Sequence, residues 1–491
     1  MAAGGGEPAL QSKSVCVVGG GVAGLAAARE LRREGHTVTV MEQSGDVGGQ
    51  WLYDPRTDGE DPLGAAAPVR VPSSIYACLR LISPREAMGF SDFQFFPRDG
   101  RDPRRFPVHG ELHCYLRDFC DAFGLMDAVR LNTTVLRVAP APTASRWAVR
   151  SARRLGTTDD DDVAQQQEEQ EEVFDAVVVA TGHYSQPMLP SDIEGMGEWT
   201  RRQLHSHSYR TPEPFRGEAV VVVGCAESGK DIALDLCRVA REVHIAASSE
   251  ATAATPAMSR MLANHGDVLR LHTQIRRLHA DGRAEFADGS SVVADTVIYC
   301  TGYTYSFPFL DTGGAVTIDS GGHVVGPLFE HVFPPSLAPS LSFVGVARKV
   351  LIPWFFEVQT RWVAQVLSGR RALPLEEEML RSVEAHLRAR EAAGVARKHT
   401  HNIAGIEPEK MYEFGERYSD LPPLEEWKKE LVMSSIASMM ADVETFRDRN
   451  DDDSEIVRKG LRGWLDLAAQ AQAKSMAVAV DVEADVQAMA N

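Results

Sequence analysis

Residues 13–42 read KSVCVVGGGVAGLAAARELRREGHTVTVME, and this stretch decides the fold of the chain. An apolar strand over 15–18 runs into a G-x-G-x-x-G turn, and a helical stretch over 25–33 ends at Gly35. A second strand over 36–41 ends on Glu42, roughly 20 residues beyond the glycines. This order of strand, turn, helix, strand and acidic residue predicts a dinucleotide-binding site.

Each glycine of the turn has its own task. Gly19 allows the tight turn, Gly21 lets backbone N–H groups approach a pyrophosphate, and Gly24 lets the helix pack on its strand. The helix N-terminus offers unpaired N–H groups and a positive dipole end to phosphates. Glu42 is expected to accept hydrogen bonds from ribose hydroxyls. The expected nucleotide contacts are Gly19, Gly20, Gly21, Val22, Ala23, Gly24 and Glu42.

The segment Gly48-Gly49-Gln50-Trp51 follows Glu42 closely. Two adjacent glycines have no side chains and accept positive φ, so the chain can bend close beneath a bulky planar ligand. A flavin adenine dinucleotide lying along the first fold would use that approach. We therefore expect FAD here, with Gly49, Gln50 and Trp51 among its contacts.

A second nucleotide motif follows later in the chain. A strand over 218–223 leads into Gly224-Cys225-Ala226-Glu227-Ser228-Gly229, with a helix expected over 230–240 and a strand over 242–247. Alanine stands at the middle glycine position, a methyl group that a small backbone shift can accommodate. The last strand leads to Ser248 and Ser249 and carries no acid, which favours NADP over NAD. Arg241 or the serine hydroxyls are candidates to hold the 2′-phosphate, or are only exposed polar residues.

Two further strands match each other. Residues 175–180 (DAVVVA) end at Thr181-Gly182, and residues 295–300 (DTVIYC) end at Thr301-Gly302. Continuous apolar runs of this kind suit parallel strands covered on both faces. The predicted fold is α/β, with two Rossmann-like dinucleotide-binding domains and a helical C-terminal region. The expected ranges are 1–196 and 306–374 for the FAD-binding domain, 197–305 for the inserted NADP-binding domain, and 375–491 for the helical region.

Several motifs together make the chain resemble the plant flavin-containing monooxygenases, in particular their sulfur-oxygenating, glucosinolate S-oxygenase-like group. The resemblance covers roughly residues 13–370. Its elements are the first turn, the segments 42–51 and 84–86, the strands 175–184 and 295–303, the segment 205–209 and the second turn.

The resemblance implies an NADPH- and O2-dependent oxidoreductase. Such an enzyme oxygenates a soft nucleophile, a thioether sulfur or an amine nitrogen such as that of N,N-dimethylaniline, through a flavin 4a-hydroperoxide. The protein positions the cofactor, excludes water and keeps NADP⁺ bound. The implied partners are a small-molecule substrate and O2. Neither the substrate nor an oligomeric state is encoded in any motif.

The chain departs from the family pattern at two places. The family places an asparagine near the flavin a few residues before Pro-Arg-Glu, and Ile82 stands there with Ser83 as a possible substitute. Isoleucine can neither donate nor accept a hydrogen bond. The family segment F-x-G-x-x-x-H-x-x-x-Y/F aligns with Trp199, Arg201, His205 and Tyr209. His205 is either a structural histidine or a proton-transfer group.

Four alternatives stay open. An uncoupled NADPH oxidase or a regulatory flavoprotein is suggested by Ile82, and an auxin-type indole-pyruvate monooxygenase is the other member of this family to consider. A disulfide reductase would need a redox cysteine pair, whereas Cys114 and Cys120 are separated by five intervening residues on an expected helix over 111–122.

Composition narrows the function classes. A net charge of −18 argues against nucleic acid or an anionic membrane surface as a partner. Much of this charge lies in an acidic segment, 157–172, expected to be a solvated loop. The 7 cysteines are scattered, and the 15 histidines form no ligand pattern, so we expect a reducing compartment and no metal. No secretory signal or apolar anchor is visible, so the expected location is cytoplasmic.

Overall fold

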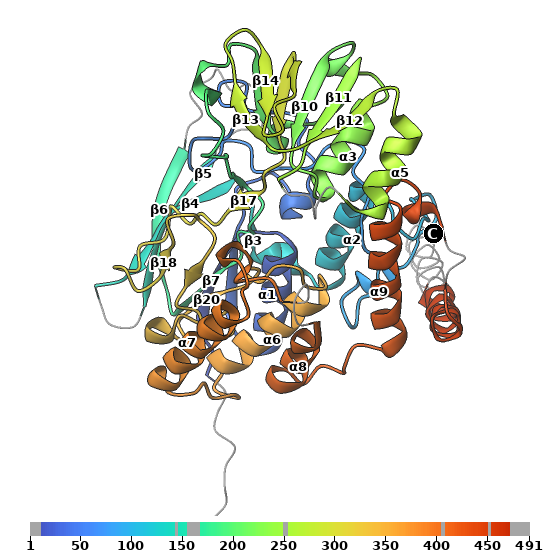
Figure 1. The fold of residues 1–491 in the computed structure, drawn as a ribbon. Helices are drawn as coiled ribbons and strands as arrows, with labels where there is room; N and C mark the ends of the chain where they lie inside the picture. Colours follow the sequence, from blue (N-terminus) through green and yellow to red (C-terminus); the bar gives the residue numbers. More distant parts are fainter. Residues whose placement is uncertain are drawn as a thin grey trace, which may run out of the picture.

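A computed structural model describes residues 11–142, 146–154, 167–248, 254–403, 408–449 and 453–471 of the chain. Figure 1 shows two Rossmann-like folds, one above the other, with helices from the C-terminal part of the chain along the bottom and the right side of the view. Among the described residues, no helix is both long and apolar enough to cross a membrane.

The first fold is built on a parallel five-stranded sheet with the order β20-β7-β1-β2-β3. Its strands are β1 (Ser14–Val18), β2 (Thr37–Met41), β3 (Val129–Arg130), β7 (Ala176–Val179) and β20 (Leu341–Phe343). Val17 pairs with Val40 on one side and Val178 on the other. The strand residues of β1 are almost all buried, as expected for a central parallel strand.

The second fold repeats this arrangement with a parallel five-stranded sheet of order β12-β11-β10-β16-β9. Its strands are β9 (Arg202–His205), β10 (Ala219–Val223), β11 (Glu242–Ala246), β12 (Leu269–His272) and β16 (Thr296–Tyr299). Val222 pairs with Ile245 and Ile298, the same register that Val17 has in the first sheet. The α/β class with two Rossmann-like folds is confirmed.

Smaller sheets accompany the two large ones. Two antiparallel sheets consist of β4 (Thr133–Pro140), β5 (Trp147–Arg154) and β6 (Gln167–Phe174), and of β13 (Ile275–Leu278), β14 (Arg283–Phe286) and β15 (Ser291–Val293). Two-stranded pairs are formed by β8 (Gln186–Pro187) with β17 (Tyr303–Thr304), and by β18 (Thr317–Ile318) with β19 (Val325–Gly326).

Strand β6 corrects one sequence prediction. Residues 167–172 were expected in an acidic loop, but they belong to this strand, and the rest of that loop, 157–166, lies outside the described residues. In the register of the sheet, residues of opposite charge stand directly opposite each other on the neighbouring strand. Glu168 faces Arg153 and Glu171 faces Arg150 across the antiparallel pair, and such cross-strand pairs stabilise a sheet.

The helices differ from the expected ones by up to four residues at their starts and ends. They are α1 (Val22–Arg33), α2 (His109–Ala122), α3 (Glu227–Leu236), α5 (Pro256–His265), α6 (Trp354–Leu367), α7 (Glu376–Ala392), α8 (Pro408–Tyr418) and α9 (Glu426–Ala441). Both α1 and α3 begin three residues earlier than predicted, directly after the middle position of each turn, Gly21 and Ala226. Residues 455–471 are also helical.

The C-terminal region packs into both folds. Met379, Met411 and Phe414 contribute to the core around α1 and α6, whereas Val443 and Phe446 contribute to the core of the second fold. In Figure 1, α8 lies beside α6, and α9 extends upward to α5. The region that the sequence predicted only as helical therefore connects the two folds.

A buried charge network joins α1 to α6. The Arg29 guanidinium contacts Glu357 at 2.6 Å and Glu30 at 2.8 Å, and all three residues are at most 2% exposed. The Ser91 amide and hydroxyl also donate to the Glu357 carboxylate. These partners satisfy two carboxylates that would otherwise be costly to bury.

Replacing Arg29 with methionine should destabilise the protein strongly. The change keeps an apolar stem but leaves the fully buried Glu357 without its ion-pair partner, which typically costs about 3–5 kcal/mol, whereas Glu30 keeps Arg33 and Arg361. We expect a clearly lower urea midpoint and melting temperature. In the control, Arg388→Met, the lost partner is Glu384 on the exposed surface of α7, so the change should cost less than about 1 kcal/mol. Equal losses in the two variants would contradict the importance of the network.

Candidate functional site

The first turn brings three backbone segments into direct contact. Gly19 has φ +105°, and a Cβ on it would lie 2.7 Å from the carbonyl oxygen of Ala180. A Cβ on Gly24 would lie 1.8 Å from the carbonyl oxygen of Gly19. No side chain fits at either position. The turn can close only with glycine at both, as the sequence predicted.

The double glycine lies directly against this turn. Gly48 N donates to Gly20 O at 2.9 Å, and a Cβ on Gly49 would lie 2.9 Å from the Cα of Gly21. Gly48 and Gly49 have φ values of +123° and +57°, which favour glycine. The 3-10 turn η1 (Gly49–Trp51) follows immediately. The two glycine-rich segments therefore form one bare backbone surface at the N-terminus of α1, a cradle suited to a pyrophosphate.

Glu42 lies behind the turn and is 4% exposed. Its Oε2 accepts a hydrogen bond from Gly20 N at 2.6 Å, and its Oε1 accepts one from Ser44 N at 2.7 Å. A carboxylate has about four acceptor positions, so ribose hydroxyls can be added to these two bonds. Glu42 also holds the turn in shape, a task that the sequence pattern did not reveal.

The second turn has the same construction. Gly224 has φ +105°, and a Cβ on it would lie 2.6 Å from Cys300 O; a Cβ on Gly229 would lie 2.0 Å from Gly224 O. Ala226, the residue before α3, has φ −77° and ψ −165°, close to the −79° and −173° of Gly21. Any residue adopts these angles. The alanine therefore leaves the shape of the turn unchanged and adds only a methyl group beside the phosphate position.

Threonines end the strand that neighbours each turn. Thr181 follows β7, and its buried Oγ1 has no hydrogen-bond partner among the described residues. Thr301 follows β16 and donates to Met188 O. Because buried polar atoms are normally paired, the Thr181 hydroxyl beside the Gly19 turn fits a site that a polar cofactor completes. The bare cradle and this hydroxyl both suit a dinucleotide.

One residue at the second turn was missed in the sequence. Lys349, at φ +55°, extends its Nζ to 2.8 Å from Glu227 Oε1 in the first turn of α3. Glu227 would place a negative charge close to a bound phosphate, and Lys349 offsets it. The two residues lie 122 positions apart, so no local motif relates them.

The structure excludes one candidate for the NADP phosphate. Arg241 precedes β11, where it donates to Gly217 O and pairs with Asp295. Ser248 follows the opposite end of the same strand and is exposed. Because β11 separates the two, the proposal that Arg241 holds the 2′-phosphate beside Ser248 is wrong. Ser249 lies outside the described residues.

The segment that matches the family hallmark is buried between the folds. His205 is fully buried, its Nδ1 accepts a hydrogen bond from His207 N, and burial lowers its pKa to about 3. Tyr209 is also fully buried and donates to Asp235 Oδ2 at 2.7 Å. His205 is therefore neutral at physiological pH. This environment favours its structural interpretation over proton transfer.

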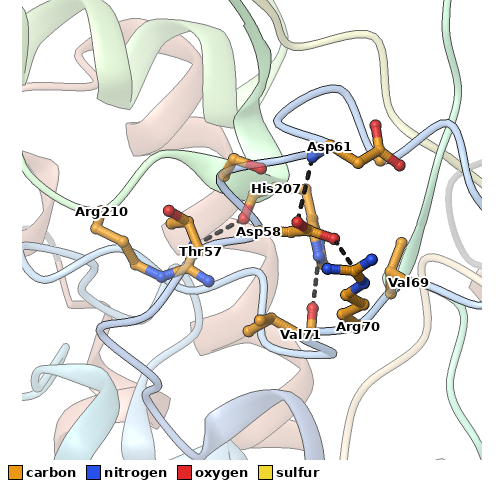
Figure 2. Close-up of a pocket in the computed structure, with 10 residues that line it drawn as sticks. Thr57, Asp58, Asp61, Val69, Arg70, Val71, His207 and Arg210 are labelled. Atoms are coloured by element: carbon orange, nitrogen blue, oxygen red, sulfur yellow. Dashed lines mark hydrogen bonds and ion pairs between the residues drawn. The ribbon is translucent and has the colours of Figure 1, made fainter. Parts of the chain in front are cut away.

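Arg210 joins this segment to residues 54–73 through hydrogen bonds to backbone carbonyl groups. It is 8% exposed and donates to the carbonyl oxygens of Asp54, Arg56, Ser73, His207 and Tyr209. Figure 2 shows it at a small pocket that His207, Asp58 and Arg70 also line. The pocket holds about 10 Å³, room for roughly one water molecule. It is therefore a packing feature and too small for an organic substrate.

Ile82 lies in an open position between two anchored residues. Leu81 is buried, with its N–H donating to Pro107 O and its carbonyl accepting from Arg447. Pro84 precedes the 3-10 turn η2 (Arg85–Ala87), in which Arg85 donates to Arg104 O and Asp102 O. Ile82 is 43% exposed and Ser83 half-buried. An exposed isoleucine in a rigid segment has no packing role of its own.

Other chemistries find less support in the geometry. Among the residues that the structure describes, no three His, Cys, Asp or Glu side chains are grouped to hold a metal ion. Cys114 and Cys120 both lie on α2, and all seven cysteines are free thiols.

Solved structures and curated proteins resemble this chain over most of its length. A structure of S-allyl-L-cysteine S-oxygenase from Allium sativum is 39% identical, covers 94% of this chain and all of its own, and superposes with a TM-score of 0.82. Tmm from Pelagibacter sp. strain HTCC7211, at 24% identity and a TM-score of 0.72, shares the fold. The flavin-containing monooxygenase FMO GS-OX-like 8 of Arabidopsis thaliana is 50% identical over 453 residues, covering 90% of this chain and 93% of its own length.

A model of the Flavin-binding monooxygenase-like family matches residues 12–267 and 259–408. FMO GS-OX5 of Arabidopsis thaliana, 42% identical, likewise covers 91% of the chain. Together with the two dinucleotide turns, these findings support FAD and NADPH as the cofactors. The chain belongs to the flavin-binding monooxygenases, a family of oxidoreductases.

Proposed function

We propose that this protein is an NADPH-consuming monooxygenase that transfers one oxygen atom to a thioether sulfur or an amine nitrogen. The observation that carries the proposal is the pair of matched turns around Gly24 and Gly229, two complete dinucleotide cradles within a chain of this family. The balanced reaction for a thioether consumes NADPH, a proton and O2 and yields a sulfoxide, NADP⁺ and water. Bound FAD supplies the redox chemistry and the activation of oxygen.

The residues divide this work between the two folds. Residues 1–196 and 306–374 form the proposed FAD-binding domain, in which the turn 19–24, Glu42, Gly49–Trp51 and Thr181-Gly182 hold the flavin nucleotide. Residues 197–305 form the proposed NADP-binding domain, in which the turn 224–229, Ser248 and Thr301-Gly302 hold the nicotinamide nucleotide. The proposed sites use backbone N–H groups and helix N-termini, so they bind and orient without a nucleophile of their own.

A sulfur substrate is the better supported of the two classes. The Allium sativum relative is named for S-oxygenation of S-allyl-L-cysteine and is 39% identical over nearly the whole chain. A soft thioether needs no activation by a protein base, which is consistent with the neutral, buried His205. We propose a small organic thioether as the substrate class, with the cytoplasm as the location.

Ile82 supports a second candidate, an enzyme that releases hydrogen peroxide. This residue replaces the asparagine of the family pattern and offers no hydrogen bond to the nicotinamide amide or the flavin. In the uncoupled reaction, NADPH, a proton and O2 yield NADP⁺ and hydrogen peroxide. The first experiment is therefore a stoichiometry of oxygen, NADPH and peroxide with a panel of thioethers, amines and indole pyruvate. Sulfoxide formed in equal amount to NADPH would support the main proposal, whereas peroxide alone would support the second candidate.

Substitutions at Gly21 test the flavin site. Gly21→Val should yield protein without flavin, because a branched side chain would meet Gly49, whose Cα already lies 3.4 Å from a Cβ built on Gly21. Gly21→Ala is the matched control. It reproduces the alanine of the second turn at nearly the same backbone angles, so it should retain most of its flavin. The absorption spectrum after purification measures both, and a full flavin spectrum in Gly21→Val would contradict the assignment.

The nucleotide preference should favour NADPH. No acid follows β11 to repel a 2′-phosphate, and Ser248 is exposed there. We expect faster flavin reduction by NADPH than by NADH in an anaerobic stopped-flow comparison. Ser248→Asp should reduce this preference, since it restores the acid that selects NAD. Equal rates for the two nucleotides in the unchanged protein would show that the second fold does not distinguish them.

Peroxide release should respond to residue 82. One hydrogen bond contributes about 0.5–1.5 kcal/mol, equivalent to roughly a 2- to 13-fold change in a rate. Ile82→Asn should therefore lower substrate-free hydrogen peroxide release by a factor in that range. Ser83→Ala is the companion variant. If Ser83 already supplies the hydrogen bond, its removal should raise release while Ile82→Asn changes little. Tight coupling that survives both substitutions would rule out an impaired site.

A further inference from the structure

Three acidic residues line one face of α3, the helix that begins at the second turn. Glu227, Asp231 and Asp235 follow each other at intervals of four residues, so they lie one above another on the helix. Each is held by a residue from a different part of the chain. Lys349 pairs with Glu227, Arg447 pairs with Asp231, and Tyr209 donates to Asp235.

Arg447 makes the middle one of these three contacts with the acidic face of α3. Its guanidinium contacts both oxygens of Asp231, at 3.3 and 2.9 Å, and its Nε donates to Leu81 O at 3.2 Å. Both charged side chains are largely shielded, with 11% and 15% exposure. A two-pronged, shielded contact of this kind fixes orientation as well as distance. One arginine from the C-terminal region therefore joins α3 to the segment that carries Ile82.

The residues around Arg447 make polar contacts with both folds. Toward the second fold, Asp442 pairs with Arg260 and Glu444 contacts His265, both on α5. Toward the first fold, Asp448 pairs with Arg80 at 2.8 Å. The 3-10 turn η9 (Phe446–Asp448) lies at the middle, and the Phe446 ring packs edge-on against Phe106.

We propose that residues 442–448 form a clasp between the two folds, and that Arg447 is a positioning residue for transfer between nicotinamide and flavin. The clasp grips α3, whose N-terminus carries the second turn, and the backbone of Leu81, next to Ile82. Because Arg447 contacts both through one rigid guanidinium, it fixes the distance between the nucleotide turn and residue 82.

Transfer from the nicotinamide to the flavin tolerates little displacement of the reacting atoms, so loosening the clasp should affect its rate. This step rests on the proposed function, in which NADPH reduces the flavin. Reacting atoms must approach to about 3–3.5 Å, and a displacement of about 1 Å costs up to about a hundredfold in rate. Loosening the clasp should therefore slow reduction by NADPH without weakening the flavin site, which lies in the first fold.

The experiment compares Arg447→Met with Asp231→Asn, their double variant, and Arg449→Gln. Arg449 pairs with Asp442 at 3.0 Å within the same C-terminal segment, so its loss removes an Arg–Asp pair that does not bridge the folds. Flavin reduction is measured anaerobically with NADPH and separately with dithionite, which needs no alignment of the second fold. We expect reduction by NADPH to slow about tenfold to a hundredfold in both single variants. The double variant should be no slower than either, because both remove one contact.

Hydrogen exchange provides a readout independent of turnover. In the flavin-loaded protein without nucleotide, Arg447→Met should raise amide exchange both in α3 and in residues 78–84, whereas Arg449→Gln should leave both unchanged. The proposal is overturned if NADPH reduces Arg447→Met within about twofold of Arg449→Gln, if dithionite reduction slows equally, or if exchange rises only in 442–448. If NADPH fails to reduce even the unchanged protein, the proposed function fails, and the exchange comparison still decides whether the clasp exists.

Discussion

Both folds depend on the same kind of contact, in which the carbonyl oxygen of one glycine lies against the Cα of another. A Cβ at Gly24 would lie 1.8 Å from Gly19 O, and a Cβ at Gly229 would lie 2.0 Å from Gly224 O. Each contact lets a helix begin directly at the end of its strand. The first backbone N–H groups of that helix have no carbonyl partner within it, so they lie at the turn as donors for a phosphate, together with the positive end of the helix dipole. A side chain at Gly24 or Gly229 would prevent this arrangement.

This dependence on backbone explains why the folds could be predicted from the sequence. Strand, turn and helix lie within about 20 residues in each motif, and glycine is the only residue that meets the steric demand. Ala226 departs from the pattern only where the demand is weak, at a φ that any residue adopts. The prediction of a loop over the acidic residues 167–172 was wrong for the opposite reason, because their structure does not depend on local sequence alone. Whether Glu168 and Glu171 lie in a loop or a strand depends on the arginines of β5 opposite them, which no local pattern specifies.

The site residues that sequence reasoning missed act over long separations. Lys349 reaches Glu227 across 122 positions, Arg447 reaches Asp231 across 216, and Arg210 collects carbonyl oxygens from residues 54–73. Arginine and lysine are ordinary surface residues in sequence, so their composition carries no signal. The prediction for Arg241 was wrong for the converse reason, because it inferred proximity in space from proximity in sequence. It stands close to Ser248 in sequence, yet the intervening strand carries the two to opposite ends of the sheet.

The nature of these long-range contacts bears on how the two folds cooperate. Each fold has its own apolar core: one is built around α1 and α6, the other around β10 and α3. Between them, charged groups and buried carbonyls make many of the connections, through Arg210, Lys349 and Arg447. Polar interfaces of this kind permit domains to move relative to one another more readily than a continuous apolar core does. Under the proposed function, the nicotinamide must approach the flavin for reduction, and an interface of this kind permits that approach. Discrete ionic contacts at α3, such as that of Arg447 with Asp231, can hold the arrangement that this approach requires.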